Sequence, residues 1–229
     1  MILDIATHKT ILFQILKDIY SDTAIAPFLG FKGGTAMFMF FGLDRFSVDL
    51  DFDLLDETKA DDVFERVISI IKRYGTLKES RKKWFSLFCL LSYEDTARNV
   101  KVEINKRQFG SRYAIKTYLG VSMLVMLPED MFAHKLMAMV ERMGKTSRDI
   151  YDVWFFLQHR FPINKQIVEQ RSGMAFDQLL SKCISQLETM SNRRILDGMG
   201  ELLTASQKDW AKVKLREDTI ALLKLQMGR

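Results

Sequence analysis

The sequence predicts an α+β fold in which a mixed front half of helices and strands is followed by an all-helical back half. Apolar residues recur at helical intervals over residues 9–20, and strand patterns dominate residues 84–126. A helical pattern then fills the rest of the chain. This change of pattern predicts two domains, over residues 1–126 and 127–229.

The front half is predicted to alternate between helices and short strands. Residues 9–20 (KTILFQILKDIY) form the first helix, and the apolar run 28–31 ends close to a glycine pair. Residues 35–41 (TAMFMFF) predict a buried helix, and residues 48–54 predict a strand. Residues 59–74 place their apolar side chains on one side, which is typical of an amphipathic helix.

A β-rich segment comes next. Residues 84–93 are rich in aromatic and aliphatic side chains, residues 100–105 (VKVEIN) alternate strictly, and residues 113–126 contain two further strand patterns. Pro128, followed by two acidic residues, is typical of the first turn of a helix. The sheet is therefore expected to end before this proline.

The composition is that of a globular protein, with 229 residues, 48% of them hydrophobic and 28% charged. Cys89 and Cys183 are far apart and lack C-x-x-C spacing, which excludes a disulfide scaffold or a zinc finger and fits a reducing compartment. The acidic residue near the start and the short apolar runs argue against secretion and a membrane span. We therefore expect a cytoplasmic protein without a membrane partner.

The net charge of +5 is unevenly distributed. Residues 1–110 carry 16 basic and 16 acidic side chains, whereas residues 111–229 carry 18 basic and 13 acidic ones. Eight acidic residues lie between Asp44 and Asp62, followed by six basic residues between Lys72 and Lys83. This pattern suits a metal site that serves a polyanionic substrate, although two solvated faces would produce it too.

Three aspartates, Asp49, Asp51 and Asp53, alternate with apolar residues along the predicted strand 48–54. Alternate side chains of a strand share a face, so the three carboxylates would project together, about 6.6 Å apart. Like charges at this spacing repel unless cations neutralise them, and oxygen-rich clusters suit Mg²⁺. An exposed acidic strand edge is the alternative interpretation.

Other acidic and glycine-rich motifs do not fit. An EF-hand loop from Asp49 needs glycine at its sixth position and glutamate at its twelfth, where the chain has Leu54 and Ala60. A P-loop pattern is absent from the sequence. The turn Gly33-Gly34-Thr35 precedes a helix whose free N–H groups suit an anion, but such a turn alone is a weak signal.

Together, the glycine turn and the acidic strand resemble a known pattern. The segment KGGTAMFMFFGLDRFSVDLDFDL is similar to the signature of AbiEii/AbiGii-type nucleotidyltransferases, a branch of the polymerase-β-like superfamily. The resemblance implies that Gly33, Gly34 and Thr35 hold a nucleotide triphosphate. It also implies that Asp49 and Asp51 bind metal ions, that Glu103 supplies a third carboxylate, and that Asp53 either replaces Glu103 or flanks the site.

A second cluster is expected in the helical half, in the segment AHKLMAMVERMGKTSRDIYDVWFF. Lys135 and Arg142 are seven residues apart and share a helix face, while Asp149 and Asp152 are three apart on the next helix. These four side chains alone would suit a structural ion-pair network.

The same resemblance extends to this second segment, which is similar to K-L-x-A-x-x-x-R followed by R-D-x-x-D. It implies that Lys135 contacts the triphosphate, with Arg142 and Arg148 also binding the nucleotide. One of the two aspartates would orient the catalytic groups. Asp152 is preferred, with Asp149 pairing Arg142 or Arg148.

The function implied by the resemblance is transfer of a nucleoside monophosphate from an NTP to an acceptor hydroxyl, with Mg²⁺ or Mn²⁺ and with release of pyrophosphate. The acceptor implied by some relatives is the 3′ end of tRNA, and the role is that of the toxin in an AbiE-like type IV toxin–antitoxin or abortive-infection system. The implied partner is an antitoxin or transcriptional regulator. A catalytically inactive nucleotide-binding or regulatory protein and a phosphohydrolase are the alternatives.

The aromatic and basic surface residues leave two interpretations open. Trp84, Trp154 and Trp210 are interpreted as core or interface residues rather than as platforms for stacking bases. The basic run from Lys72 to Lys83 either contacts RNA phosphates or forms a solvated face.

Overall fold

The computed structural model describes residues 4–95 and 98–228 and divides into two compact units. The first unit holds the described residues up to Gln108 together with Arg112–Leu127. The second holds Phe109–Ser111 and the described residues from Pro128 onward. Each unit is described by itself below.

The first unit is built on a seven-stranded mixed sheet with the order β3-β4-β5-β2-β1-β7-β6. Parallel pairing joins β1 to β7 and β2 to β5, and the other neighbours are antiparallel. The strands are β1 (Leu29–Lys32), β2 (Asp49–Leu54), β3 (Thr76–Lys82), β4 (Ser86–Ser92), β5 (Val100–Asn105), β6 (Tyr113–Tyr118) and β7 (Val121–Met126).

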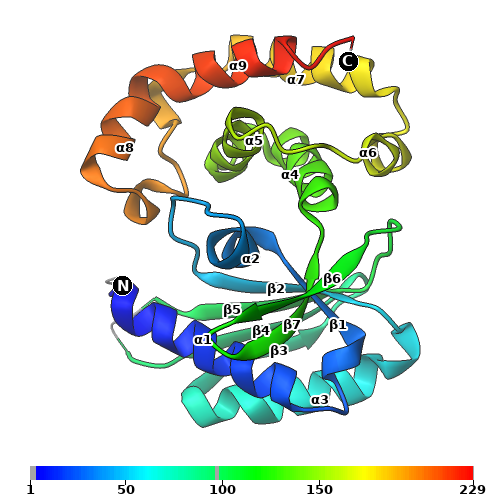
Figure 1. Cartoon of the computed structure of the whole chain (residues 1–229). Coiled ribbons are helices and arrows are strands. Elements are labelled where there is room, and N and C mark those ends of the chain that lie inside the picture. The colour runs from blue at the N-terminus through cyan, green and yellow to red at the C-terminus, as the bar shows by residue number, and fades with distance from the viewer. Residues whose placement is uncertain (1–3, 96–97, 229) are drawn as a thin grey trace. The chain divides into compact units, whose positions relative to one another are not determined.

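Helices lie on both faces of this sheet. Figure 1 shows α1 (Ile5–Ser21) and α3 (Ala60–Ile71) on one face and α2 (Gly33–Phe40) on the other. The side chains of Leu50 and Phe52 on β2 are fully buried on the α1/α3 face. The alternation along β2 therefore turns its aspartates toward the α2 face.

The second unit is helical throughout its regular structure, as expected for the back half of the chain. Its helices are α4 (Pro128–Arg142), α5 (Arg148–Gln158), α6 (Lys165–Ser172), α7 (Phe176–Thr189), α8 (Ala205–Trp210) and α9 (Arg216–Lys224). A π-helical turn, Ala211–Leu215, links α8 to α9. In Figure 1, α4 and α5 lie side by side, and α5 packs on α9.

Two differences from the sequence-based expectations concern neighbouring residues. Strand β3 was not predicted, because its side chains are mostly exposed and show no apolar alternation at the edge of the sheet. Trp84, which was expected in the core or in an interface, is 84% exposed. A core role for this tryptophan is therefore wrong.

Two further observations concern the cysteines and the helices. Both cysteines are free and buried, and burial raises the pKa of the Cys89 and Cys183 thiols to about 12, so they are protonated at neutral pH. Among the described residues, no helix combines the length and the apolar character required to cross a bilayer.

Candidate functional site

The three aspartates of β2 lie in register with polar residues of β5. Asp49 is paired with Lys101, Asp51 with Glu103, and Asp53 with Asn105. Paired residues on neighbouring strands share a face, so both sets of side chains project from the α2 face. The parallel pairing of β2 and β5 thus builds a polar surface from two segments that lie far apart in the sequence.

The ammonium group of Lys101 lies among the carboxylates of Asp49, Asp51 and Glu103. We call these four side chains the carboxylate cluster. Lys101 Nζ is 3.6 Å from Asp49 Oδ2, 3.7 Å from Asp51 Oδ1 and 3.2 Å from Glu103 Oε2. The charge of Asp51, then those of Asp49 and Glu103, raises the pKa of Lys101 despite its burial. The three carboxylates thus converge on a shared point, which the ammonium group of Lys101 occupies.

Both oxygens of Asp53 have partners within the first unit. Its Oδ1 accepts from Lys32 Nζ at 2.5 Å and from Asn105 Nδ2 at 2.8 Å, and its Oδ2 accepts from the Tyr113 hydroxyl at 2.6 Å. Burial would raise the pKa of Asp53, but the charge of Lys32 and these hydrogen bonds outweigh it and lower the pKa. Asp53 therefore links β2 to β1, β5 and β6, and its oxygens are already engaged in these contacts.

Two glycines allow α2 to start directly against β2. Gly33 has a φ of +80°, and a Cβ there would lie 2.5 Å from Asp51 Oδ2. A Cβ at Gly34 would lie 2.7 Å from the hydroxyl oxygen of Ser47. Only a residue without a side chain brings the backbone so close to the Asp51 carboxylate, with the first N–H groups of α2 beside it.

The Thr35 side chain has a structural partner. Its hydroxyl donates a hydrogen bond of 2.5 Å to the backbone carbonyl of Asp49, and the residue is 1% exposed. This bond ties the first turn of α2 to the start of β2. Any contact of Thr35 with a phosphate would therefore come from its backbone N–H, since its hydroxyl proton already has an acceptor.

His8 fixes the backbone just before Asp49. Its Nε2 lies 3.0 Å from the carbonyl oxygen of Val48 and its Nδ1 lies 2.9 Å from the Tyr93 hydroxyl. Since a carbonyl can only accept, Nε2 carries the proton and Nδ1 accepts from Tyr93. Burial lowers the pKa of His8, so the neutral ring is the form that holds β2.

The donor set of the carboxylate cluster fits a divalent cation of the Mg²⁺ type. Asp49, Asp51 and Glu103 supply carboxylate oxygens that converge on one positive charge, which is the chemistry that Mg²⁺ prefers. Within residues 4–95 and 98–228, no group of three or more acidic, histidine or cysteine side chains is spaced to hold an ion. The carboxylates are therefore suitable in kind but not in spacing. Ion binding would require them to move closer together and the divalent ion to displace Lys101 from their oxygens.

In the second unit, four charged side chains form what we call the aspartate pair cluster. Lys135 Nζ lies 2.6 Å from Asp152 Oδ2 and 3.4 Å from Asp149 Oδ1, and Arg142 Nη2 lies 2.7 Å from Asp149 Oδ2. The side chains of Asp149 and Asp152 are 1% and 0% exposed. Helices α4 and α5 thus bring two buried acids together with the nearly buried Lys135 and the partly exposed Arg142.

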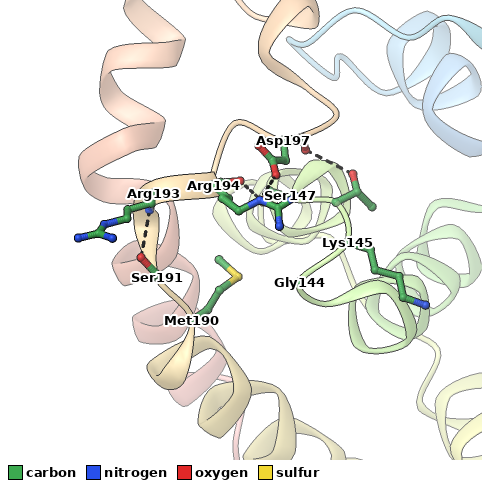
Figure 2. Close-up of a pocket in the computed structure, with 9 residues that line it drawn as sticks. Gly144, Lys145, Ser147, Met190, Ser191, Arg193, Arg194 and Asp197 are labelled. Carbon is green, nitrogen blue, oxygen red and sulfur yellow. Dashed lines mark hydrogen bonds and ion pairs between the residues drawn. The ribbon is translucent and has the colours of Figure 1, made fainter.

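The turn between α4 and α5 borders a cavity of about 340 Å³ in the second unit. Its lining includes Lys145 and Arg193, whose charged ends point away from the cavity in Figure 2. Arg194 Nε instead pairs with Asp197 Oδ2 at 2.5 Å. Ser147, the residue before α5, makes no capping bond and donates to the Arg194 carbonyl. Two basic side chains of the lining therefore point away from the cavity, and a third is paired with Asp197.

The remaining expected site residue, Arg148, begins α5. Its backbone N–H donates to Thr146 Oγ1 at 3.4 Å. Sequence reasoning did not single out Lys32, Lys101, Asn105 or Tyr113 as neighbours of the acidic row. For Lys101 a signal was present, because strict alternation in VKVEIN places it on the same face as Glu103.

Comparisons with known proteins agree on the type of fold. Residues 14–216 match the family model described as nucleotidyl transferase AbiEii toxin, type IV toxin–antitoxin system. A comparison of the sequence with curated proteins yielded no match.

Among solved structures, the chain is similar to a proposed nucleotidyltransferase from Helicobacter pylori, with a TM-score of 0.62, 20% identity, and coverage of 98% of this chain and 95% of the other. A second Helicobacter pylori protein gives a TM-score of 0.55 and 20% identity over 98% and 96% of the two chains. An antigenic nucleotidyltransferase-like protein from Paracoccidioides brasiliensis gives 0.53 and 15% over 85% and 92%. The mixed sheet with flanking helices thus has a nucleotidyltransferase-like fold, which confirms the expected α+β fold class.

Proposed function

The chain belongs to the AbiEii nucleotidyl transferase toxin family of type IV toxin–antitoxin systems, and from this premise we propose that it transfers a nucleoside monophosphate from an NTP to an acceptor hydroxyl. In this reaction, the acceptor oxygen forms a bond to the α-phosphorus while the bond from that phosphorus to the β-phosphate oxygen breaks. Pyrophosphate leaves, and the acceptor hydroxyl gives up its proton. The convergence of Asp49, Asp51 and Glu103 on one cation is the observation that supports this proposal.

Asp49 and Asp51, with help from Glu103, are proposed to hold Mg²⁺ or Mn²⁺. When bound, such ions activate the acceptor hydroxyl and stabilise the charge on the departing pyrophosphate. Asp53 is proposed to keep the neighbouring strands in place, because Lys32, Asn105 and Tyr113 already satisfy its oxygens.

Phosphate-binding residues are proposed in each unit. Gly33, Gly34 and the backbone of Thr35 offer N–H groups at the start of α2, next to Asp51. Lys135, with Arg142 and Arg148, is proposed to bind phosphate as a positively charged group, which rests on the family pattern in this segment. Asp152 is then a positioning residue, because its carboxylate lies 2.6 Å from Lys135 Nζ.

The 3′ end of tRNA is the acceptor that we propose, and growth arrest through blocked translation is the expected consequence in a cell. A cognate antitoxin that counteracts the toxin is the proposed partner. A cytoplasmic location follows from such a substrate. These assignments rest on the family rather than on a contact within either unit.

Transfer is tested by incubating the purified protein with total tRNA, Mg²⁺ and NTPs labelled at the α-phosphate. The wild type is expected to label the RNA, whereas Asp49→Ala and Asp51→Ala are expected to label it at least about a hundredfold more slowly. Asp61→Ala is the matched control, because Asp61 lies on α3 with its side chain 82% exposed. Equal labelling by all four proteins would overturn the assignment of the carboxylates.

One observation favours a second candidate, a nucleotide-binding protein without turnover. Lys101 already neutralises part of the carboxylate cluster, so the cluster can persist without a metal ion. This candidate predicts that nucleotide binds while neither pyrophosphate nor labelled RNA is formed. Release of inorganic phosphate from a γ-labelled NTP would instead indicate phosphohydrolase chemistry.

A further inference from the structure

The hairpin between β3 and β4 presents two aromatic side chains to solvent at its tip. Trp84 is 84% exposed and Phe85 is 54% exposed. They occupy the two positions between Lys83 and Ser86, where the Lys83 N–H donates to the Ser86 carbonyl at 2.8 Å. Tight turns favour glycine, proline, asparagine, aspartate and serine, so turn chemistry does not explain this pair of large rings. Exposed aromatic groups of this kind point to a binding surface.

Positively charged side chains lie over Phe85 and over Phe88 on the adjoining strand β4. Lys83 Nζ lies 4.0 Å from the centre of the Phe88 ring, and the guanidinium of Arg107 lies 5.2 Å from the centre of the Phe85 ring. The Lys106 N–H donates to the Phe85 carbonyl at 2.9 Å, which ties the end of β5 to the hairpin tip. The sequence has no acidic residue over 80–93 or over 104–128, so the tip has a basic and aromatic character.

The register of the sheet connects this tip to the carboxylate cluster. Phe88 on β4 is paired with Glu103 on β5, and Glu103 is paired with Asp51 on β2. The three side chains therefore share the α2 face of the sheet. Two strand spacings of about 4.8 Å separate the backbones of Phe88 and Asp51, or about 10 Å. A ligand on Phe88 thus lies next to the proposed centre of phosphoryl transfer.

Adjacent residues at the end of β3 have opposite orientations. Lys82 Nζ lies 2.9 Å from Asp61 Oδ1 and 5.4 Å from the centre of the Phe64 ring, both on α3. Lys83 instead lies over Phe88, on the face of the carboxylates. The two lysines are a matched pair, because they have the same charge and are adjacent in the chain but lie on opposite faces of the sheet.

We propose that Trp84, Phe85 and Phe88, with Lys83 and Arg107, bind the unpaired bases and phosphates of a single-stranded RNA end. This inference rests on the proposed function in one respect, since the RNA end would be the acceptor in the transfer reaction. Aromatic rings stack on unpaired bases whatever their sequence, and lysine and arginine bind the phosphates between them. A folded protein partner would instead need a larger apolar patch with satisfied polar groups at its rim.

Binding is measured with the full chain and a fluorescein-labelled 12-nucleotide single-stranded RNA by fluorescence anisotropy, without NTP or metal ions. Trp84→Ala is expected to weaken binding about tenfold or more, through the loss of one base stack. Lys83→Ala is expected to weaken binding and to reduce the slope of log affinity against log salt by about 0.7, because one phosphate contact is lost. The same RNA as a duplex is expected to bind more weakly, since its bases are already stacked.

Two control variants keep this test specific. Ile115→Ala removes a side chain that is 76% exposed on the opposite edge strand β6, and Lys82→Ala removes the lysine on the α3 face. Both are expected to bind the RNA as the wild type does. Circular dichroism and a urea midpoint equal to those of the wild type establish that each variant is folded.

The result is independent of whether the proposed transfer reaction is correct. Asp51→Ala is expected to keep RNA binding while it loses transfer, whereas Trp84→Ala is expected to lose both with an RNA acceptor. A wild-type protein that does not bind the RNA would overturn the proposed RNA surface. Transfer to another acceptor could still occur, and release of pyrophosphate would detect it. Affinities of Trp84→Ala and Lys83→Ala within twofold of the controls, or equal affinity for the duplex, would likewise overturn the proposed RNA surface.

Discussion

The two units each contain a cluster of carboxylates and cations, but the clusters differ in burial and in balance of charge. In the carboxylate cluster, Asp49, Asp51 and Glu103 are 16%, 29% and 34% exposed, and three negative groups face the ammonium of Lys101. In the aspartate pair cluster, two fully buried aspartates face Lys135 and Arg142.

This difference separates a cluster suited to bind cations from one in which buried aspartates hold Lys135 and Arg142 in place. The four side chains of the first cluster sum to a formal charge of −2, and water reaches them. The four side chains of the second sum to zero, and its two aspartates are buried while Arg142 is 43% exposed. Buried charges are tolerated where they are paired, whereas a partly exposed excess of carboxylates attracts further cations.

Removing one carboxylate from each cluster provides the largest contrast. Asp152→Asn leaves Lys135 buried with weaker compensation, so it is expected to lower the free energy of unfolding by about 3 kcal/mol. Asp51→Asn relieves repulsion among partly exposed groups and is expected to change stability by less than about 1 kcal/mol. Urea unfolding followed by circular dichroism measures both. Equal losses in the two variants would show that both clusters are structural.

A metal titration sharpens the same comparison. Lys101→Met leaves the carboxylates without their ammonium group, so the variant is expected to be less stable than the wild type in the absence of divalent ions. Mg²⁺ at about 100 times its dissociation constant stabilises the folded state by about 2.7 kcal/mol, and at a fixed Mg²⁺ concentration tighter binding gives a larger effect. The expected result is a larger Mg²⁺-induced rise in melting temperature for Lys101→Met than for the wild type.

The control for this titration is the double variant Lys101→Met/Asp51→Asn, which lacks one of the carboxylates. It is expected to respond less to Mg²⁺ than Lys101→Met does. If both variants and the wild type respond equally, the ion acts elsewhere on the protein and the carboxylate cluster is not its site.

Much of the carboxylate cluster was predictable because its geometry follows from local alternation. Period-two alternation predicted that Asp49, Asp51 and Asp53 share a face, and the resemblance to the family brought Glu103 into consideration. The pairing of β2 with β5 is a long-range event, so the register that sets Asp51 against Glu103 could not be derived from either segment alone.

Other features of the site depend on contacts that leave no local pattern. Tyr113 reaches Asp53 only because Gly30 has no side chain, since a Cβ there would lie 2.2 Å from the Tyr113 ring. Strand β3 has no buried face to create an apolar alternation, so it was missed, and with it the hairpin that exposes Trp84. Conversely, the spacing of Lys135, Arg142, Asp149 and Asp152 on two helices was sufficient to predict their convergence.

Gly33→Ala tests the close approach of α2 to the carboxylate cluster. The new Cβ would lie 2.5 Å from Asp51 Oδ2, and a φ of +80° is unfavourable for alanine by about 1–2 kcal/mol. Because the steric clash adds to this backbone cost, we expect a loss in the free energy of unfolding larger than that of the control, together with weaker nucleotide binding. Gly110→Ala is the matched control, since its φ is +68° and its Cβ would meet nothing within 4 Å. Equal effects of the two substitutions would mean that backbone strain alone accounts for the loss.

The smallest expected effect concerns the pH dependence of the first unit through His8. Burial lowers the pKa of His8 below the ordinary value of 6.5, so the unfolded chain binds a proton at a higher pH than the folded chain does. The stability that the neutral ring contributes is therefore complete above about pH 6.5 and is lost progressively as the pH falls below it. His8→Gln can still donate to the Val48 carbonyl but does not titrate, so its unfolding free energy is expected to decline less between pH 7 and pH 5. Identical declines in wild type and variant would assign the acid sensitivity to other groups.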